Sequence, residues 1–221
     1  MKVAIHQPDY IPYLGYFYKA SMADVFVFLD DCQFSSTNWH NWNRIKGSQG
    51  EERLKIPTNY KMGMLINQVR TRDELDWKRK HLRALEMNYR RAPYFGVVYD
   101  TFANLLMRMY DNLAEQNIAI DTAFFRRFGI STKLYRSSDM GINTKSEERV
   151  LDICEKLGAT EYLSGSGALA YQQEAHFTER GIKLTYLSHH IKEYAQQWGP
   201  YIANLSVIDY QFNCGFTTDL Q

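Results

Sequence analysis

The chain has 221 residues and a formal net charge of +1, and these two facts already exclude several classes of protein. A chain of this length can bury a substantial core in one domain, and its balanced charge gives no electrostatic reason to expect duplex nucleic acid as a partner. We expect no membrane span, because no run approaches about 18 apolar residues, and no signal peptide, because the N-terminal segment MKVAIHQPDY lacks an apolar core. The 3 cysteines are widely spaced, lack zinc spacing and are typical of reduced thiols in a cytoplasmic protein.

Residues 3–46 predict a strand, a helix, a second strand and a polar loop. The segments 3–5 and 25–29 are continuous apolar runs, which are typical of strands covered on both faces in a parallel sheet. Pro12 stands where the first turn of a helix tolerates proline. The segment between the two runs therefore predicts the helix of a βαβ crossover.

Polar side chains follow both of these predicted strands. Ligands of open parallel sheets bind beyond the carboxyl ends of the strands, so both groups should meet at one edge. Each residue taken singly is compatible with an ordinary loop, but the whole set indicates a site. The set comprises His6, Gln7, Asp9, Tyr10 and Tyr13 after the first strand, Asp30, Asp31 and Gln33 after the second, and Asn43, Arg44 and Lys46 in the next loop.

Several motifs in the chain carry a resemblance to a known family. They are QPDYIPYLGYF at 7–17, DVFVFLDDCQF at 24–34, the loop that holds Trp39, Asn41, Asn43, Arg44 and Ile45, APYF at 92–95, YLSG at 162–165 and NLSVIDYQFNCG at 204–215. Over nearly its whole length the sequence resembles the WbqC-like protein family. Two positions depart from the family pattern, because His6 stands where many relatives carry methionine and Trp42 interrupts what is often an Asn-Arg-Asn-Arg run. The first departure weakens His6 as a general base, and the second removes any arginine role at position 42.

The resemblance implies a role in the biosynthesis of O-antigen lipopolysaccharide and related surface polysaccharides, since WbqC-like proteins are associated with those gene clusters. Within that pathway we expect a transferase that acts on a nucleotide-linked sugar. Acyl or aminoacyl transfer to a sugar amine is the expected reaction, with an acyl or aminoacyl donor as the second reactant.

Residues 43–128 predict a β-hairpin and a helical region inserted into a single domain that spans 1–221. The residues 47–50 have the composition of a hairpin turn. Apolar residues recur at helical spacing over 73–91, 95–116 and 118–128, with a break at Asn117. The hairpin segment 43–70 is equally compatible with a lid over the ligand edge and with a simple addition to the edge of the sheet.

The last part of the chain predicts three more strands, at 130–135, 161–163 and 182–187, and a short helix over 205–212. Thr144 and Glu147 have the spacing of a capping box and predict a helix over 144–158. Ser164, Gly165, Ser166 and Gly167 follow a strand directly and should open a helix over 168–177. Such a loop presents backbone N–H groups and a positive dipole end to a phosphate. A tight turn without a ligand is the alternative, because the loop lacks a Walker lysine and the dinucleotide glycine pattern.

The order of elements predicts an α/β fold with a Rossmann-like, mostly parallel five-stranded sheet. In the first functional hypothesis, Asp30, Asp31 or His6 accepts a proton from the attacking amine. The substrate is bound by Gln7, Tyr10, Tyr13, Gln33, Asn43, Arg44 and Lys46, residues 164–167 bind its diphosphate, and no metal site is assigned. The second hypothesis is a nucleotidyltransferase-like enzyme that uses ATP and magnesium, with Asp30 and Asp31 facing the metal. The third is a non-catalytic assembly factor of the polysaccharide pathway.

Overall fold

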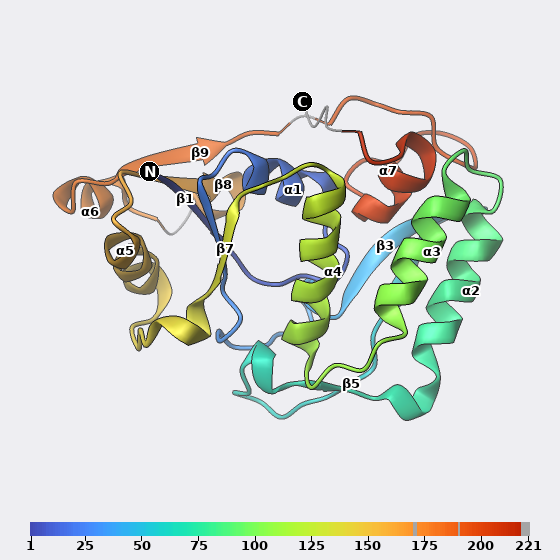
Figure 1. The fold of residues 1–221 in the computed structure, drawn as a ribbon, viewed down its shortest axis with the longest axis horizontal. Coiled ribbons are helices and arrows are strands. Elements are labelled where there is room, and N and C mark those ends of the chain that lie inside the picture. Colours follow the sequence, from blue (N-terminus) through green and yellow to red (C-terminus); the bar gives the residue numbers. More distant parts are fainter. Residues whose placement is uncertain (170–171, 190, 218–221) are drawn as a thin grey trace.

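The fold is seen in a computed structural model that describes residues 1–169, 172–189 and 191–217. Its centre is a five-stranded parallel sheet in the order β7-β2-β1-β8-β9 (Figure 1). The strands are β1 (Lys2–His6), β2 (Val25–Phe28), β7 (Lys133–Arg136), β8 (Glu161–Gly165) and β9 (Lys183–Leu187). The predicted α/β class and the parallel pairing of all five strands are confirmed, although β7 begins three residues later than the apolar run at 130.

Alternate side chains of the central strands face two separate cores. Val25 and Val27 of β2 pack with α5 (Ser146–Leu157) and α6 (Glu174–Glu179). Phe26 and Phe28 point to the other face, where α1 (Leu14–Ser21) and α4 (Leu113–Arg127) cover them. This period of two explains why both strands read as continuous apolar runs. Each fully buried aliphatic or aromatic side chain contributes roughly 1.5–3 kcal/mol to the stability of this layered arrangement.

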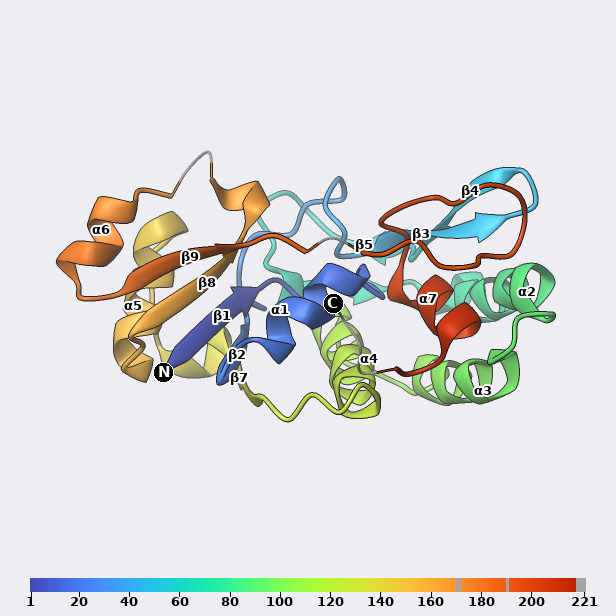
Figure 2. The same cartoon turned by 90° about the horizontal axis from the view of Figure 1, so that it is seen from above.

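The segment between β2 and β7 forms a second group of elements beside the sheet, on the side away from α5 and α6 (Figures 1 and 2). Its β3–β4 hairpin is antiparallel, and a short β5–β6 pair follows. The helix α7 returns from the C-terminal part of the chain to pack against α3 and β3. The elements are β3 (Trp42–Gly47), β4 (Gly50–Lys55), β5 (Thr58–Asn59), β6 (Arg70–Thr71), α2 (Trp77–Tyr89), α3 (Phe95–Leu106) and α7 (Val207–Cys214), with 3₁₀ turns at Ile66–Gln68, Asp73–Leu75, Ser137–Met140 and Ser166–Ala168.

The predicted helix break at Asn117 is wrong, because α4 runs through this residue without interruption. The helix begins instead after Asn112, whose side-chain oxygen accepts a hydrogen bond from the Glu115 N–H at 2.9 Å. The buried amide of Asn117 donates to the carbonyl oxygens of Pro8 at 3.0 Å and His40 at 2.8 Å. Asn117 therefore ties α4 to two loops of the sheet edge.

The predicted capping box and the helix predicted at 168–177 also differ from the structure. Thr144 Oγ1 donates to Asp152 at 2.6 Å and caps no helix, and Glu147 accepts from the backbone N–H of Gln173 at 2.7 Å. Among the residues that the structure describes, β8 is followed by a three-residue 3₁₀ turn, and α6 begins at Glu174. In this described part of the chain, the loop 164–167 does not lead directly into the predicted regular helix.

The order of the sheet places a reversal of chain direction between β1 and β8. From β1 the chain proceeds outward to β2 and β7, and it later returns to the other side of β1 with β8 and β9. A reversal of this kind opens a crevice at the carboxyl ends of the two central strands, where ligands of open α/β sheets bind. His6 ends β1 and Gly165 ends β8, so these residues mark the crevice.

In the part of the chain that the structure describes, no helix is both long enough and apolar enough to cross a bilayer.

Candidate functional site

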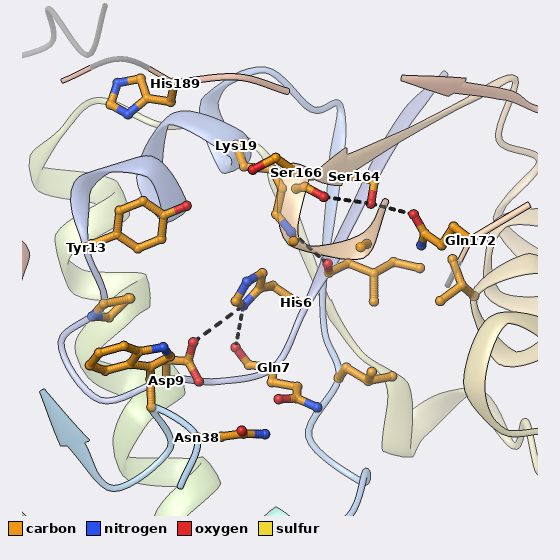
Figure 3. Close-up of a pocket in the computed structure, with 18 of the residues that line it drawn as sticks. His6, Gln7, Asp9, Tyr13, Lys19, Asn38, Ser164, Ser166, Gln172 and His189 are labelled. Atoms are coloured by element: carbon orange, nitrogen blue, oxygen red, sulfur yellow. Dashed lines mark hydrogen bonds and ion pairs between the residues drawn. The ribbon is translucent and has the colours of Figure 1, made fainter. Parts of the chain in front are cut away.

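The crevice at the ends of β1 and β8 contains a cavity of about 850 Å³ (Figure 3). Its volume falls within the range of about 300–1,000 Å³ that is typical of small-molecule sites. One side of it is formed by the turn that follows β1 and by the loop before β3. The other side is formed by residues 164–168, Gln172 and the start of α5.

His6 and Asp9 form a close pair in this cavity. Nδ1 of His6 lies 3.7 Å from Oδ2 of Asp9 and 3.1 Å from the carbonyl oxygen of Gln7. The edge of the His6 ring meets Tyr16, with the ring centroids 4.7 Å apart. Burial, followed by the positive charge of Lys19, lowers the pKa of His6 well below its usual value. His6 is therefore neutral at pH 7, and a proton on Nδ1 leaves Nε2 as the proton acceptor.

Asp9 and Lys19 have pKa values that meet near neutrality. Both residues are 6% exposed and both line the cavity. Burial raises the pKa of Asp9 to about 7, against the opposing effect of Lys19, and burial lowers the pKa of Lys19 to about 7, against the opposing effect of Asp9. The ammonium group of Lys19 donates to the carbonyl oxygen of Ile5 at 2.9 Å. A carboxyl and an amine that both titrate near pH 7 are suited to moving a proton during a reaction.

A second buried carboxyl, Asp121 of α4, lies behind this pair. The residue is fully buried, and burial followed by the negative charge of Asp9 raises the pKa of Asp121 well above its usual value. The hydroxyl of Tyr16 faces the Asp121 carboxyl and also donates a long hydrogen bond to Gln7 O at 3.4 Å. The raised pKa favours the protonated form of Asp121, which limits the negative charge next to Asp9.

The loop 164–167 exposes its backbone to the other side of the cavity. Ser164 Oγ donates to Gln172 Oε1 at 2.7 Å, which fixes the start of the loop. Gly165 has an ordinary extended φ of −80°, and a Cβ added at Gly165 or Gly167 would meet no atom within 4 Å. Neither backbone strain nor a close neighbour requires glycine at these two positions. Because glycine has no side chain, these positions leave space in the cavity, and a ligand can approach the main chain closely.

Asn43 lines the cavity, but its side-chain amide forms hydrogen bonds to the turn that follows β1. Its Nδ2 donates to the carbonyl oxygens of Tyr10 at 3.0 Å and Ile11 at 2.9 Å, and its Oδ1 accepts from the N–H of Arg44 at 2.8 Å. Ile11 has a φ of +41°, a left-handed conformation that costs energy in a β-branched residue. Asn43 is thus one of the groups that hold a strained turn in place, and this turn carries Tyr13 into the cavity.

Asp30 and Asp31 are not among the residues that line the cavity. Asp30 is buried and accepts from the backbone N–H of Ser138 at 3.0 Å, from its hydroxyl at 2.8 Å and from the Ser137 hydroxyl at 3.2 Å. Asp31 accepts from the Ser137 hydroxyl and forms an ion pair with Arg149. These carboxylates join the end of β2 to the 3₁₀ turn after β7 and to α5, and the predicted convergence of both with His6 in one cavity is not seen.

Three other predicted site residues also lie away from the cavity. Tyr10 is fully buried and its hydroxyl lies 2.9 Å from Nδ1 of His81. Gln33 forms an isolated β-bridge with Leu65. Lys46 is buried, and its ammonium group donates to Gln196 Oε1 at 3.0 Å. The predicted residues that the structure brings together are His6, Gln7, Tyr13, Asn43, Arg44, Ser164, Gly165, Ser166 and Gly167.

Arg44 reaches the cavity, but its guanidinium is already engaged. Nη1 donates to both carboxylate oxygens of Glu51, at 2.8 and 3.0 Å, and Nη2 donates to the Asn204 carbonyl oxygen at 3.3 Å. Glu51 lies on β4, the neighbouring strand of the hairpin.

Four residues of the site were given no role from the sequence. The sequence places Asp9 in the polar set without a catalytic role, and only its position in the cavity distinguishes it from Asp30, which is also buried. Lys19 lies in a helix where a basic residue normally faces water, and Asp121 lies in a helix that covers the sheet. Trp39 is part of the motif-bearing loop, and its large aromatic side chain between polar residues was the one signal in the sequence.

Two comparisons with known proteins found a match over almost the whole chain. A family model described as the WbqC-like protein family matches residues 7–219. The chain is 37% identical over 218 residues to a protein of Mycobacterium tuberculosis (strain ATCC 25618 / H37Rv) named uncharacterized protein Rv1507c, and the match covers 97% of this chain and 94% of that protein. No solved structure matches the chain at a significant level.

Proposed function

Since the chain belongs to the WbqC-like protein family, we propose that it is a cytoplasmic transferase of O-antigen or related surface-polysaccharide biosynthesis. The proposed reaction is the transfer of an acyl or aminoacyl group to the amine of a nucleotide-linked amino sugar. The association of the family with polysaccharide gene clusters supports the pathway, and the groups in the cavity support the reaction.

The observation that carries the proposal is the close pair of His6 and Asp9 in a cavity at the reversal point of the sheet. Acyl transfer to an amine requires a base that takes a proton from the nitrogen as the N–C bond forms. Asp9 meets this requirement, because its pKa of about 7 allows it to accept a proton and to release it again at neutral pH. Methionine at position 6 in many relatives also favours Asp9 over His6 as the base.

The proposed sequence of events uses three side chains of the cavity. The neutral sugar amine attacks the carbonyl carbon of the donor, and Asp9 accepts the proton that the nitrogen loses. The ammonium form of Lys19 stabilises the negative charge that develops on the carbonyl oxygen. The bond to the leaving group then breaks, and the proton held by Asp9 passes to that leaving group. His6, 3.7 Å from the Asp9 carboxyl, keeps the local charge low because it is neutral.

The loop 164–167 is the proposed site for the diphosphate of the substrate. The open space beside Gly165 and Gly167 supports this assignment, because it allows a phosphate to reach the backbone. The phosphate would be bound by backbone N–H groups of the loop itself, since the described residues that directly follow β8 form a 3₁₀ turn. The bonds that Asp30 and Asp31 make to Ser137, Ser138 and Arg149 favour the transferase over a magnesium-dependent nucleotidyltransferase built on these two carboxylates.

The proposal is tested by incubating the protein with UDP-glucosamine and a panel of acyl-CoA donors and following the sugar nucleotide by mass spectrometry. We expect one donor to add the mass of its acyl group to the sugar amine, and we expect Asp9→Asn to lose that product. Asp111→Asn, a change at an exposed loop residue outside the cavity, serves as the matched control. The proposal would be contradicted if the wild-type protein bound no nucleotide sugar in a thermal-shift screen that also includes dTDP- and GDP-linked sugars.

A further inference from the structure

We propose that Trp39, together with Tyr13, forms a platform on which the pyranose ring of the substrate stacks. This inference rests on the proposed function and adds the residues that recognise the sugar. Both side chains line the cavity and both are unusually exposed for aromatic residues, at 40% for Trp39 and 42% for Tyr13. The C–H face of a pyranose is apolar, and the negative face of an aromatic ring attracts its polarised hydrogens.

The Trp39 indole is held firmly before any ligand binds. Its ring packs on Trp42 with the centroids 4.2 Å apart, and the guanidinium of Arg53 lies 3.6 Å from the Trp42 ring. The guanidinium of Arg44 lies 5.4 Å from the Trp39 ring, and Glu51 holds Arg44 in place. A side chain with fixed neighbours loses little conformational entropy on binding, which favours affinity.

The Tyr13 ring is placed by the glycine two residues later. A Cβ added at Gly15 would lie 2.3 Å from Cε2 of Tyr13 and 2.8 Å from its hydroxyl oxygen. The Tyr13 ring therefore lies directly over Gly15 and can occupy this position only because that residue has no side chain. Gly15 therefore allows the Tyr13 ring to pack where it lines the cavity.

The position of the platform identifies the sugar, and not the nucleobase, as the group it contacts. The carbonyl oxygen of Trp39 accepts from the N–H of Tyr10 at 2.9 Å, which places the Trp39 main chain next to the residue that follows Asp9. In Figure 3, Tyr13 and Asp9 lie on one side of His6, and Ser164 and Gln172 lie on the other. In a nucleotide sugar the diphosphate stands between base and sugar. With the diphosphate at residues 164–167, one end of the substrate lies on the Asp9 side, and the proposed reaction, in which Asp9 takes a proton from the sugar amine, makes that end the sugar.

The test compares matched pairs of ligands that differ only in the sugar. UDP-glucosamine and UDP form one pair, and dTDP-glucose and dTDP form the other, with affinities measured by isothermal titration calorimetry. We expect Trp39→Ala to weaken binding of the sugar-bearing ligands about 2- to 12-fold, the range for contacts between aromatic faces, and to leave UDP and dTDP unchanged. Trp39→Phe should recover part of the loss, and Gly15→Ala should reproduce part of it by displacing Tyr13. Tyr135→Ala, which removes an aromatic side chain that is 45% exposed and outside the cavity, is the control.

Each other outcome overturns a specific claim. Equal weakening of UDP and UDP-glucosamine in Trp39→Ala would show that the platform holds the nucleobase, and it would reject the inference while leaving the proposed function intact. Unchanged affinity for all four ligands would reject the platform. Failure of the wild-type protein to bind any of the four would reject both the platform and the nucleotide-sugar function. Unchanged binding of UDP by Trp39→Ala also demonstrates that the variant is folded.

Discussion

Oδ2 of Asp9 lies 3.7 Å from Nδ1 of His6, although neither side chain is charged in the ordinary way at neutral pH. Burial raises the pKa of Asp9 to about 7 and lowers that of His6, so the pair carries less charge than a histidine and an aspartate on the surface would. A weakly charged, buried pair costs less free energy of desolvation than a full ion pair. Because the pKa of Asp9 is about 7, its carboxyl can take up and release a proton at neutral pH.

Activity should rise with pH as Asp9 ionises near pH 7, because Asp9 acts as a base only when it is ionised, and it should fall again as Lys19 loses its proton, also near pH 7, so that the profile is bell-shaped. We expect Asp9→Asn to lower kcat/KM by about 10²- to 10⁴-fold, the usual contribution of a general base, and to remove this rise from the pH profile. A carbon-13 NMR titration of the Asp9 carboxyl measures its pKa directly. A midpoint near 4 in the folded protein would contradict the assignment, whatever the kinetics show.

Asp121→Asn should stabilise the protein increasingly as the pH rises. The folded pKa of Asp121 is raised, so above about pH 4 the folded protein retains a proton that the unfolded chain has lost. Wild-type stability therefore falls with pH across this window, by about 1.4 kcal/mol for each pH unit between the unfolded and folded pKa values. Asparagine does not titrate, so the free energy of unfolding of Asp121→Asn does not fall with pH for this reason. Urea unfolding of both proteins at pH 5 and pH 8 measures the difference, and an offset between the two curves that does not change with pH would argue against a protonated Asp121.

Gly167→Val should weaken binding of UDP by at least about 10-fold, because loss of a hydrogen bond to a charged group costs about 1.5–3 kcal/mol. Stability should change by less than about 0.5 kcal/mol, since the new side chain meets only open space. Gly96→Val makes the same change in α3, at another glycine with no atom close to the added Cβ, and should leave UDP affinity unchanged. Wild-type affinity in a folded Gly167→Val protein would remove the loop 164–167 from the phosphate site.

Lys46→Met should destabilise the protein without altering ligand affinity. The Lys46 ammonium group bonds to Gln196 Oε1 at 3.0 Å and to the carbonyl oxygens of Gly199, at 3.4 Å, and Pro200. Methionine leaves these acceptors without their donor, at a cost of about 1–3 kcal/mol. Hydrogen exchange over 196–200 should accelerate, whereas Lys61→Met at an exposed lysine should have little effect. If Lys46→Met lost affinity for the nucleotide sugar at unchanged stability, Lys46 would instead be a substrate-binding residue.

Arg44→Lys should lower stability by about 0.2–1 kcal/mol, because lysine cannot reproduce the two bonds to a half-exposed Glu51. Glu51→Gln should cost a similar amount, and the double variant should cost little more than either change alone. UDP affinity should remain close to that of the wild type in all three proteins. A loss of UDP affinity of more than about 10-fold in Arg44→Lys alone would show instead that the guanidinium clamps the phosphate, the bidentate contact that arginine geometry also allows.

The sequence predicted the centre of the sheet well because β1 and β2 are buried on both faces. Runs such as 25–29 have no polar residue to confuse the pattern, and all five predicted strands pair in parallel. Boundaries set by side-chain bonds were less predictable. Thr144 has the spacing of a helix cap but bonds to Asp152, and no local pattern distinguishes these two choices.

The candidate site was harder to predict because it depends on contacts between distant segments. Asp9, Asp30 and Asp31 all follow strands, and no local pattern separates them. Ser137 and Ser138 donate hydrogen bonds to the Asp30 carboxylate, and they lie more than 100 positions further along the chain. The raised pKa of Asp9 likewise comes from burial, which depends on the completed fold.

Ser206 holds the turn after β1 from a distance of 195 positions, through its hydroxyl bond to Ile11 O at 2.7 Å. The next residue, Val207, donates its N–H to the carbonyl oxygen of Pro12 at 2.8 Å. During synthesis, the turn that carries Tyr13 therefore emerges from the ribosome long before the residues that fix it. Contacts between such distant positions form late in folding. Substrate can then stabilise only chains in which α7 has docked, and a nascent chain that stops short of residue 206 should gain no protection from it.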